Sequence, residues 1–223
     1  MKVRSGEIHA LVGTNHSGRE EVCRAIFGAD EFDAGTIRYN GRTVSRPTVR
    51  ESAYGGIAYL PSERKVESMV AGMTVAENVH LTHRGERASA LFVNPAARHQ
   101  QTKEWISKLN IRPPIPNVDI ASLSGGNQQK VVLAKWLRDP KLSLLILDHP
   151  TRGIDPGARE DVSAQVFAAC EKGAAVLLIA DTLEEAITLA DTITVMRDGE
   201  LTATFDLNSG SIPTHAELVG KMI

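Results

Sequence analysis

Short apolar runs alternate along the 223-residue chain with polar segments of helical character. Each run is rich in Leu, Ile, Val and Ala and nearly continuous, which is typical of strands buried on both faces of a parallel sheet. The runs occupy residues 7–12, 57–61, 144–148 and 174–180. Because such strands alternate with helical segments, we expect an α/β fold in which helices cover both faces of the sheet.

The intervening segments predict helices and hairpins. Helices are expected at 21–27, 96–109, 129–138 and 158–171, and hairpins at 35–44 and 192–205. The turn of the first hairpin is Asn40-Gly41, a strong hairpin signal. Thr74 and Glu77 have the spacing of a capping box ahead of a further short helix. Residues 113–116 contain three prolines and predict an extended connector.

This pattern divides the chain into three parts. Residues 1–62 form the first part of a sheet core, 63–122 a helical subdomain, and 123–223 the second part of the core. The length fits one domain with an inserted subdomain and is ample for a sizeable hydrophobic core. No element is predicted for the tail at 208–223.

Charge and cysteine content narrow the class of protein. A net charge of −2 and an isoelectric point near 6.4 provide no electrostatic patch for nucleic acid or an anionic membrane. Cys23 and Cys170 lie in apolar segments, which favours reduced structural thiols over a disulfide or a metal site. No apolar run approaches the ~20 residues of a membrane span, and residues 1–6 are too short and polar for a signal peptide. We therefore expect a cytoplasmic protein that reaches a membrane only through a partner.

A glycine loop joins the first strand to the first helix. Strand, glycine loop and helix in this order predict a phosphate-binding loop, because the loop N–H groups and the helix N-terminus converge on the phosphates. Such loops use Lys and then Ser or Thr where this chain has Arg19 and Glu20. Arg19 keeps the charge but is larger and planar, and Glu20 brings an anion to a polyphosphate. The predicted nucleotide-binding residues of the loop are Gly13, Thr14, Asn15, His16, Ser17, Gly18, Arg19 and Glu20.

A second glycine turn precedes the helix at 129–138. Ser124, Gly125 and Gly126 present backbone N–H groups at a helix N-terminus, which favours an anion, although a simple N-cap is the alternative for Ser124. Downstream, an apolar run ends in Asp148 at the carboxyl edge of the predicted sheet. A hard oxygen ligand at that edge suits Mg²⁺ beside phosphates. The two features together indicate a nucleotide.

These motifs resemble those of a known family. Leu123-Ser124-Gly125-Gly126-Asn127-Gln128 resembles the signature loop of ATP-binding cassette (ABC) ATPases, and Leu144-Leu145-Ile146-Leu147-Asp148 resembles their Walker B strand. Asn127-Gln128-Gln129-Lys130 and Thr151-Arg152-Gly153-Ile154-Asp155 are similar to the ATPase subunits of ribose-, xylose- and galactose-type sugar importers. Those subunits carry two nucleotide-binding halves, and Gly18-Arg19 resembles the second half. The resemblance covers nearly the whole chain and implies a P-loop, RecA-like parallel-sheet ATPase core with an inserted helical subdomain.

The resemblance assigns roles to residues at the strand ends. Ser62 stands where the family has a Gln that senses the γ-phosphate, and an exposed polar loop is an equal alternative for it. His149 stands at the catalytic Glu position, and Asp181 stands at the switch His position. His149 can accept a proton near neutral pH but lacks the charge and reach of Glu, while an ionised Asp181 cannot donate. Asp148 would hold the metal.

The resemblance also implies a partner. In ABC dimers, ATP is held between the phosphate loop of one half and the signature loop of the other. The residues implied to act on a partner's ATP are Ser124, Gly125, Gly126, Gln128 and Asp155. Because Glu20, Ser62, His149 and Asp181 all depart from the family pattern, we expect this chain's own site to hydrolyse ATP poorly or not at all.

Cofactors, partners and alternatives follow from the same resemblance. It implies ATP and Mg²⁺, a second nucleotide-binding half, membrane permease subunits and, indirectly, a periplasmic or lipoprotein sugar-binding protein, at the cytoplasmic face of the membrane. It also implies preceding strands that carry an adenine-stacking aromatic, and we expect these N-terminal strands to be missing.

One alternative is a non-hydrolysing, nucleotide-responsive dimerisation module. A DNA-handling ABC ATPase is disfavoured by the slightly negative net charge of the chain and by the lack of a coiled-coil insertion. The sugar cannot be inferred, because specificity lies in other subunits.

Overall fold

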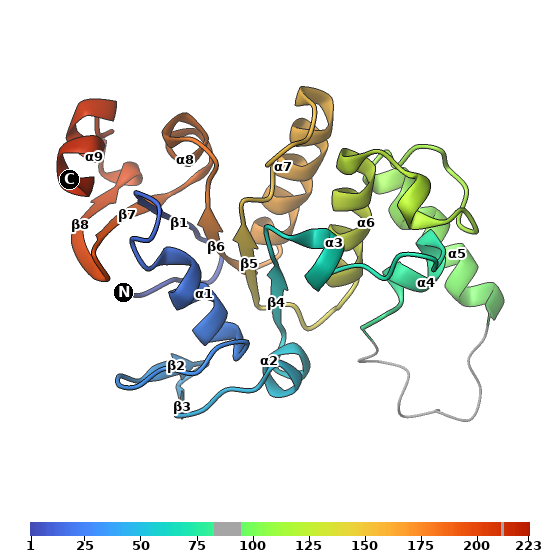
Figure 1. The fold of residues 1–223 in the computed structure, drawn as a ribbon, viewed down its shortest axis with the longest axis horizontal. Helices are drawn as coiled ribbons and strands as arrows, with labels where there is room; N and C mark the ends of the chain where they lie inside the picture. Colours follow the sequence, from blue (N-terminus) through green and yellow to red (C-terminus); the bar gives the residue numbers. More distant parts are fainter. Residues whose placement is uncertain (83–94, 211) are drawn as a thin grey trace.

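The structure of the chain, a computed structural model, describes residues 1–82, 95–210 and 212–223. Its main element in these ranges is a six-stranded sheet with the order β4-β5-β6-β1-β7-β8 (Figure 1). The strands are β1 (Ile8–Gly13), β4 (Ile57–Leu60), β5 (Leu144–Asp148), β6 (Ala175–Ile179), β7 (Thr192–Arg197) and β8 (Glu200–Asp206). All neighbours are parallel except β7 and β8, which form the predicted closing hairpin.

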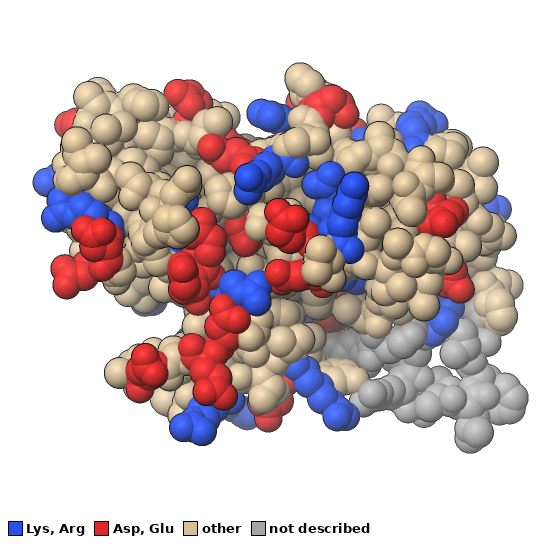
Figure 2. Space-filling model, in the orientation of Figure 1, with Lys and Arg blue, Asp and Glu red and all other residues tan. Residues whose placement is uncertain are grey.

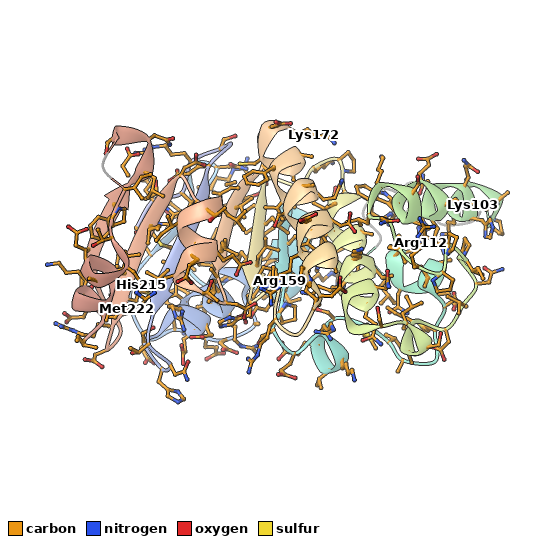
Figure 3. All side chains as sticks on the ribbon, turned by 90° about the horizontal axis from the view of Figure 1, so that it is seen from above. Lys103, Arg112, Arg159, Lys172, His215 and Met222 are labelled. Atoms are coloured by element: carbon orange, nitrogen blue, oxygen red, sulfur yellow. The ribbon has the colours of Figure 1, made fainter. Side chains whose placement is uncertain are left out.

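Helices lie on both faces of this sheet, as the strand pattern predicts. α1 (Arg19–Phe27) lies on one face, and α7 (Pro156–Glu171) and α8 (Leu183–Leu189) lie on the other (Figures 1 and 3). Because both faces are covered, β5 and β6 are buried along almost their whole length. The parallel-sheet α/β architecture expected from the sequence is therefore confirmed.

Two smaller units flank the sheet. The hairpin of β2 (Ile37–Tyr39) and β3 (Arg42–Val44) turns at Asn40 and Gly41, which both have positive φ, and α2 (Val49–Gly55) follows it. At the other end lie α3 (Arg64–Glu67), α4 (Val75–Val79), α5 (Pro95–Lys108), the 3-10 turn η2 (Ile120–Ser122) and α6 (Gly125–Leu137). The predicted capping box begins α4: Thr74 Oγ1 accepts from the Glu77 N–H at 3.2 Å, and Glu77 Oε2 accepts from the Thr74 N–H at 2.7 Å.

The C-terminal tail, for which no element was expected, contains two. The 3-10 turn η3 (Leu207–Ser209) leads to α9 (His215–Met222), which packs against β7 and β8. α9 begins with a capping box between Thr214 and Glu217. Figure 3 places His215 and Met222 at the opposite end of the molecule from Lys103 of α5.

One hydrophobic core joins these layers. It includes the side chains of β1, β4, β5 and β6, and Trp136 of α6 packs edge-on against Phe27 of α1. Cys23 and Cys170 are free, buried thiols, as expected. No helix in the described ranges is long and apolar enough to cross a membrane. The three-part division of the chain stays a prediction.

Candidate functional site

The glycine loop lies at the carboxyl end of β1 and leads directly into α1. A side chain at Gly13 is excluded by packing, because a Cβ there would lie 2.5 Å from the carbonyl oxygen of Met196. Gly18 caps α1 with φ 97°, which glycine adopts without strain. His16 has φ 64° in the left-handed region that non-glycine residues seldom adopt. The loop thus keeps a tight turn at this edge of the sheet.

Asp148 lies beside this loop, at the end of β5. Its carboxylate is 3% exposed, and Oδ2 accepts a 2.9 Å hydrogen bond from the hydroxyl of Tyr59 on β4. Burial raises the pKa of Asp148, while the Tyr59 hydroxyl and the backbone N–H of Ser62 act in the opposite direction. Oδ1 is buried without a hydrogen-bond partner in the described chain. A buried, unpaired carboxylate oxygen is suited to hold a proton or a cation.

His149 follows Asp148 and connects two carboxylates. Its Nδ1 lies 3.0 Å from Oδ1 of Asp181, and its Nε2 lies 3.5 Å from Oε1 of Glu20. The backbone at His149 has φ 50°, and its N–H donates to the carbonyl of Ile179 on β6. The hydrogen bond with Asp181 is the main reason that the pKa of His149 is raised, with Asp148 and Glu20 adding to it against burial.

Asp181 is the centre of a second group of contacts. Its Oδ2 accepts from the hydroxyl of Thr151 at 2.8 Å, and Thr151 also lies 2.8 Å from Oε1 of Glu185. The backbone N–H of Asp181 donates to Glu185 Oε2 at 2.8 Å. Burial acts to raise the pKa of Asp181, but the hydrogen bonds from His149 and Thr151 outweigh it, so the pKa is lowered. Asp181 is therefore an ionised acceptor that cannot donate.

Arg19 lies against Glu20 at the start of α1. Arg19 is only 5% exposed, its Nη2 lies 3.4 Å from Glu20 Oε1, and its Nε has no hydrogen-bond partner in the described chain. The side chains thus form a row of alternating charge: Arg19, Glu20, His149 and Asp181. Figure 2 shows acidic side chains gathered on the part of the molecular face formed by α1 and the β2–β3 hairpin.

This site does not fit a magnesium-bound triphosphate. The carboxylates of Glu20, Asp148, Asp181 and Glu185 outnumber the cationic groups beside them, which are Arg19, His149 and, through its charge on Asp181, Arg152, so the excess charge is negative where phosphates would lie. Oδ1 of Asp148 is the one buried carboxylate oxygen without a hydrogen-bond partner among the described residues. No group of three or more His, Cys, Asp or Glu in the described ranges has the arrangement of a metal site.

The second glycine turn forms the head of α6. This helix begins at Gly125, earlier than the expected start at 129, because the Ser124 side chain accepts from the backbone N–H of Asn127 and extends the helix back. Ser124 is exposed. Gly126 packs against α7, since a Cβ on it would lie 2.8 Å from the Cβ of Ala158. The first turn of α6 is therefore held in place by packing, with Ser124 at its exposed edge.

Two further predicted residues lie beneath or beside this turn. Gln128 is 4% exposed, and its side-chain amide donates to the carbonyls of Ile120 and Leu123 at 3.3 and 3.0 Å. It supports the turn from below and does not face solvent, in contrast to the role expected for it. Asp155 is exposed and accepts from the N–H of Ala158 at 3.0 Å, so it caps α7. Its expected contact across an interface stays a prediction.

Four residues with contacts at these sites were missed from the sequence: Tyr59, Thr151, Glu185 and Arg64. Tyr59 carried a signal, because a buried Tyr in an otherwise apolar strand needs a partner for its hydroxyl. The other three gave none, since their contacts depend on which strand ends are neighbours.

With this geometry in place, a family assignment can be made. The family model described as ABC transporter matches residues 1–152. The chain belongs to this family. The matched range includes the glycine loop, the signature turn and the strand ending in Asp148.

Several curated relatives are sugar-import ATPases. A putative ribose/galactose/methyl galactoside import ATP-binding protein of Rhizobium etli is 38% identical over 202 residues, which span 91% of this chain and 38% of the relative. A ribose import ATP-binding protein of Streptomyces coelicolor is 39% identical over 204 residues, spanning 91% of this chain and 40% of the relative. The chain thus spans about two fifths of the length of these relatives.

Solved ATP-binding cassettes share the fold. A dimeric cassette in a post-hydrolysis state bound to ADP and Pi has a TM-score of 0.79 at 20% identity, covering 93% of this chain and 88% of that one. A nucleotide-free cassette has a TM-score of 0.80 at 19% identity, and the alignment covers 100% of this chain and 90% of that one. At these identities the likeness concerns the fold, which is the P-loop ATPase core expected from the sequence.

Proposed function

We propose that this chain is the ATP-binding half of a carbohydrate importer that completes the ATP site of a partner half and hydrolyses little or no ATP itself. Its relatives are named as sugar-import ATP-binding proteins, and a cassette of the same fold forms a dimer. By the same analogy, the partners are permease subunits at the cytoplasmic face of the membrane and, through them, a sugar-binding protein. The proposal has two parts, a weakened phosphate loop and a working signature turn.

The observation that carries the first part is the position of Glu20. Its carboxylate lies between the Arg19 guanidinium at 3.4 Å and the His149 imidazole at 3.5 Å. The two side chains that could attract phosphate are thus already neutralised by an internal anion. A polyphosphate would have to displace Glu20 while approaching Asp148 and Asp181, which costs free energy through like-charge repulsion. This supports weak nucleotide binding by the loop.

The chemistry of turnover is weakened for a separate reason. In a hydrolytic site a carboxylate orients or deprotonates the attacking water. His149 stands in that position, but its Nδ1 is engaged with Asp181 and its Nε2 faces Glu20 and Asp148. These carboxylates raise the pKa of the His149 imidazole and so favour its protonated form, which cannot accept a proton from water. Little hydrolysis at this chain's own loop is the expected result.

The second part rests on the head of α6. Ser124 is exposed at the N-terminus of this 13-residue helix, where the helix dipole favours an anion, so the turn can meet an anion presented by another molecule. The carboxylate of Asp155 lies beside this turn, with Oδ2 3.2 Å from where a Cβ on Gly126 would be, but its Oδ1 accepts from the N–H of Ala158, and the guanidinium of Arg64 lies against Gly125. The chain thus combines an anion-repelling loop with a helix end that carries a nearby cation, which is the asymmetry that a complementary half requires.

A repaired copy of this chain provides the test. It carries substitutions toward the family pattern in its own site and a disabled signature turn: Arg19→Lys, Glu20→Thr, His149→Glu, Asp181→His and Ser124→Arg. We call it the repaired partner. Steady-state ATP turnover is measured for the wild-type chain alone, the repaired partner alone, and their mixture. We expect turnover only in the mixture.

Matched variants of the wild-type chain complete this experiment. Ser124→Arg in the wild-type chain should abolish stimulation of the repaired partner, whereas Ser209→Arg, an exposed serine near β8, should not. No stimulation by the wild-type chain would contradict the proposal. Nucleotide binding without any turnover would favour the dimerisation module instead.

A further inference from the structure

Arg64 lies against the signature turn from a different part of the chain. A Cβ placed on Gly125 would lie 2.6 Å from Nη2 and 3.7 Å from Cζ of Arg64, so the guanidinium is in contact with the backbone of the turn. Arg64 begins α3, two residues after Ser62. The segment that follows β4 therefore reaches the head of α6 directly.

The charge of this guanidinium is uncompensated. Arg64 forms no ion pair or hydrogen bond through its side chain with residues 1–82, 95–210 or 212–223, and its Nε is buried without a partner. The nearest acid on the same helix, Glu67, is engaged by Arg24 at 2.8 Å. A guanidinium excluded from water on one edge and left unpaired is costly unless another group meets it.

The same segment also contacts the far end of α6. Nζ of Lys135 donates to the carbonyl of Ser68 at 2.7 Å, and the N–H groups of Ser68 and Met69 donate to the carbonyl of Arg64 at 3.0 and 3.1 Å. Residues 64–69 thus hold α6 at both ends, at Gly125 and at Lys135. On its other side, this segment is continuous with Ser62, whose backbone N–H faces Asp148.

We propose that Arg64 is a positioning residue for the signature turn: its guanidinium packs against the backbone at Gly125 and places a positive charge at the head of α6. The turn is thereby linked, through Ser62, to the end of β5 where Asp148 lies. The inference rests on the proposed function, because the anion that this charge meets is the nucleotide held by the partner half.

Amide hydrogen exchange tests the positioning role without any partner. In Arg64→Met, the amides of the first two turns of α6 should exchange about tenfold faster, because local opening is no longer opposed by the guanidinium, while those of β5 should not change. Lys65→Met removes an exposed neighbour on α3 and is the matched control. Unchanged exchange in α6 would overturn the inference, whatever the partner assay gives.

Turnover with the repaired partner tests the charge. With Arg64→Met, kcat of the mixture should fall about tenfold or more, while the KM for ATP changes less than about twofold, because the nucleotide is bound first by the other half. Arg64→Lys should recover part of kcat, since it keeps the charge but not the planar contact. Full kcat in Arg64→Met would overturn the inference. Absence of stimulation by the wild-type chain would instead count against the proposed function, and the exchange result would still decide the role of Arg64.

Discussion

The imidazole of His149 and the carboxylate of Asp181 form a 3.0 Å contact between Nδ1 and Oδ1 at the ends of β5 and β6. In the resemblance to ABC ATPases, a carboxylate is expected at the first position and a His at the second. This chain has the two chemical groups exchanged. The acid–imidazole contact is therefore kept, while the group that could act on water and the group that could donate to a phosphate have changed places.

This exchange predicts a strong coupling between the two positions. His149→Glu alone brings a second carboxylate against Asp181, and Asp181→His alone pairs two imidazoles, so each should lower the free energy of unfolding by about 1–3 kcal/mol. The double variant restores an acid–imidazole pair and should lie within about 1 kcal/mol of wild type. Urea unfolding of all four proteins measures the coupling energy. Additive effects of the single changes would show that the contact is incidental.

Glu20 should control nucleotide affinity. Glu20→Thr removes the anion between Arg19 and His149 and frees the Arg19 guanidinium, so binding of a fluorescent ATP analogue should tighten about tenfold or more, a gain of about 1.4 kcal/mol. Glu21→Thr changes the exposed neighbour on α1 and should leave affinity unaltered. Equal effects of the two substitutions would mean that general charge, and not the position of Glu20, sets the affinity.

The two signature glycines should respond differently to alanine. A Cβ on Gly126 would meet the Cβ of Ala158, which is fixed on α7, and Gly126→Ala should therefore cost about 1–3 kcal/mol in thermal or urea unfolding. A Cβ on Gly125 would displace the end of the Arg64 side chain, so Gly125→Ala should cost no more than about 1.4 kcal/mol, the equivalent of the tenfold faster exchange expected for Arg64→Met. A larger loss in Gly125→Ala would mean that Arg64 cannot move aside.

Lys135 should make stability depend on pH in the alkaline range. Burial lowers the pKa of Lys135 from 10.5 to about 8, so the folded protein disfavours the charged form. Below about pH 8, burying the charged lysine lowers the free energy of unfolding by the full amount. This destabilisation disappears as the pH rises through 10.5, so the free energy of unfolding increases by up to about 3 kcal/mol over this range. The difference between wild type and Lys135→Met, followed by urea unfolding from pH 8 to 10.5, isolates this contribution. Parallel curves for the two proteins would contradict it.

The sequence was most informative where one local rule decides the structure. The buried runs at 144–148 and 174–180 could be assigned because only a covered parallel strand tolerates such continuous apolar character. The Asn40-Gly41 turn followed from backbone freedom at two positions. In contrast, α9 was missed although Thr214 and Glu217 form a capping box, because an amphipathic segment of only eight residues is a weak helix signal.

The candidate site was harder to predict than the fold. The order of the strands decides that Tyr59 reaches Asp148 and that Glu20 reaches His149, and a single sequence does not contain that order. The start of α6 was placed too late because glycines are poor helix formers, and the capping by Ser124 outweighs that tendency. The burial of Gln128 likewise follows from packing that no local pattern reveals.

The position of β1 in the sheet has a consequence for how the molecule is made. Ile8 pairs with Val176 and His9 with Thr192, so both neighbours of β1 come from the last part of the chain. While the ribosome is still synthesising residues before β6, this apolar strand has no partner in the sheet, and such long-range parallel pairing is slow. The glycine loop is therefore translated well before the strands that pair with β1 on either side of it. A nascent chain stalled before Ala175 would expose β1 and be prone to aggregation.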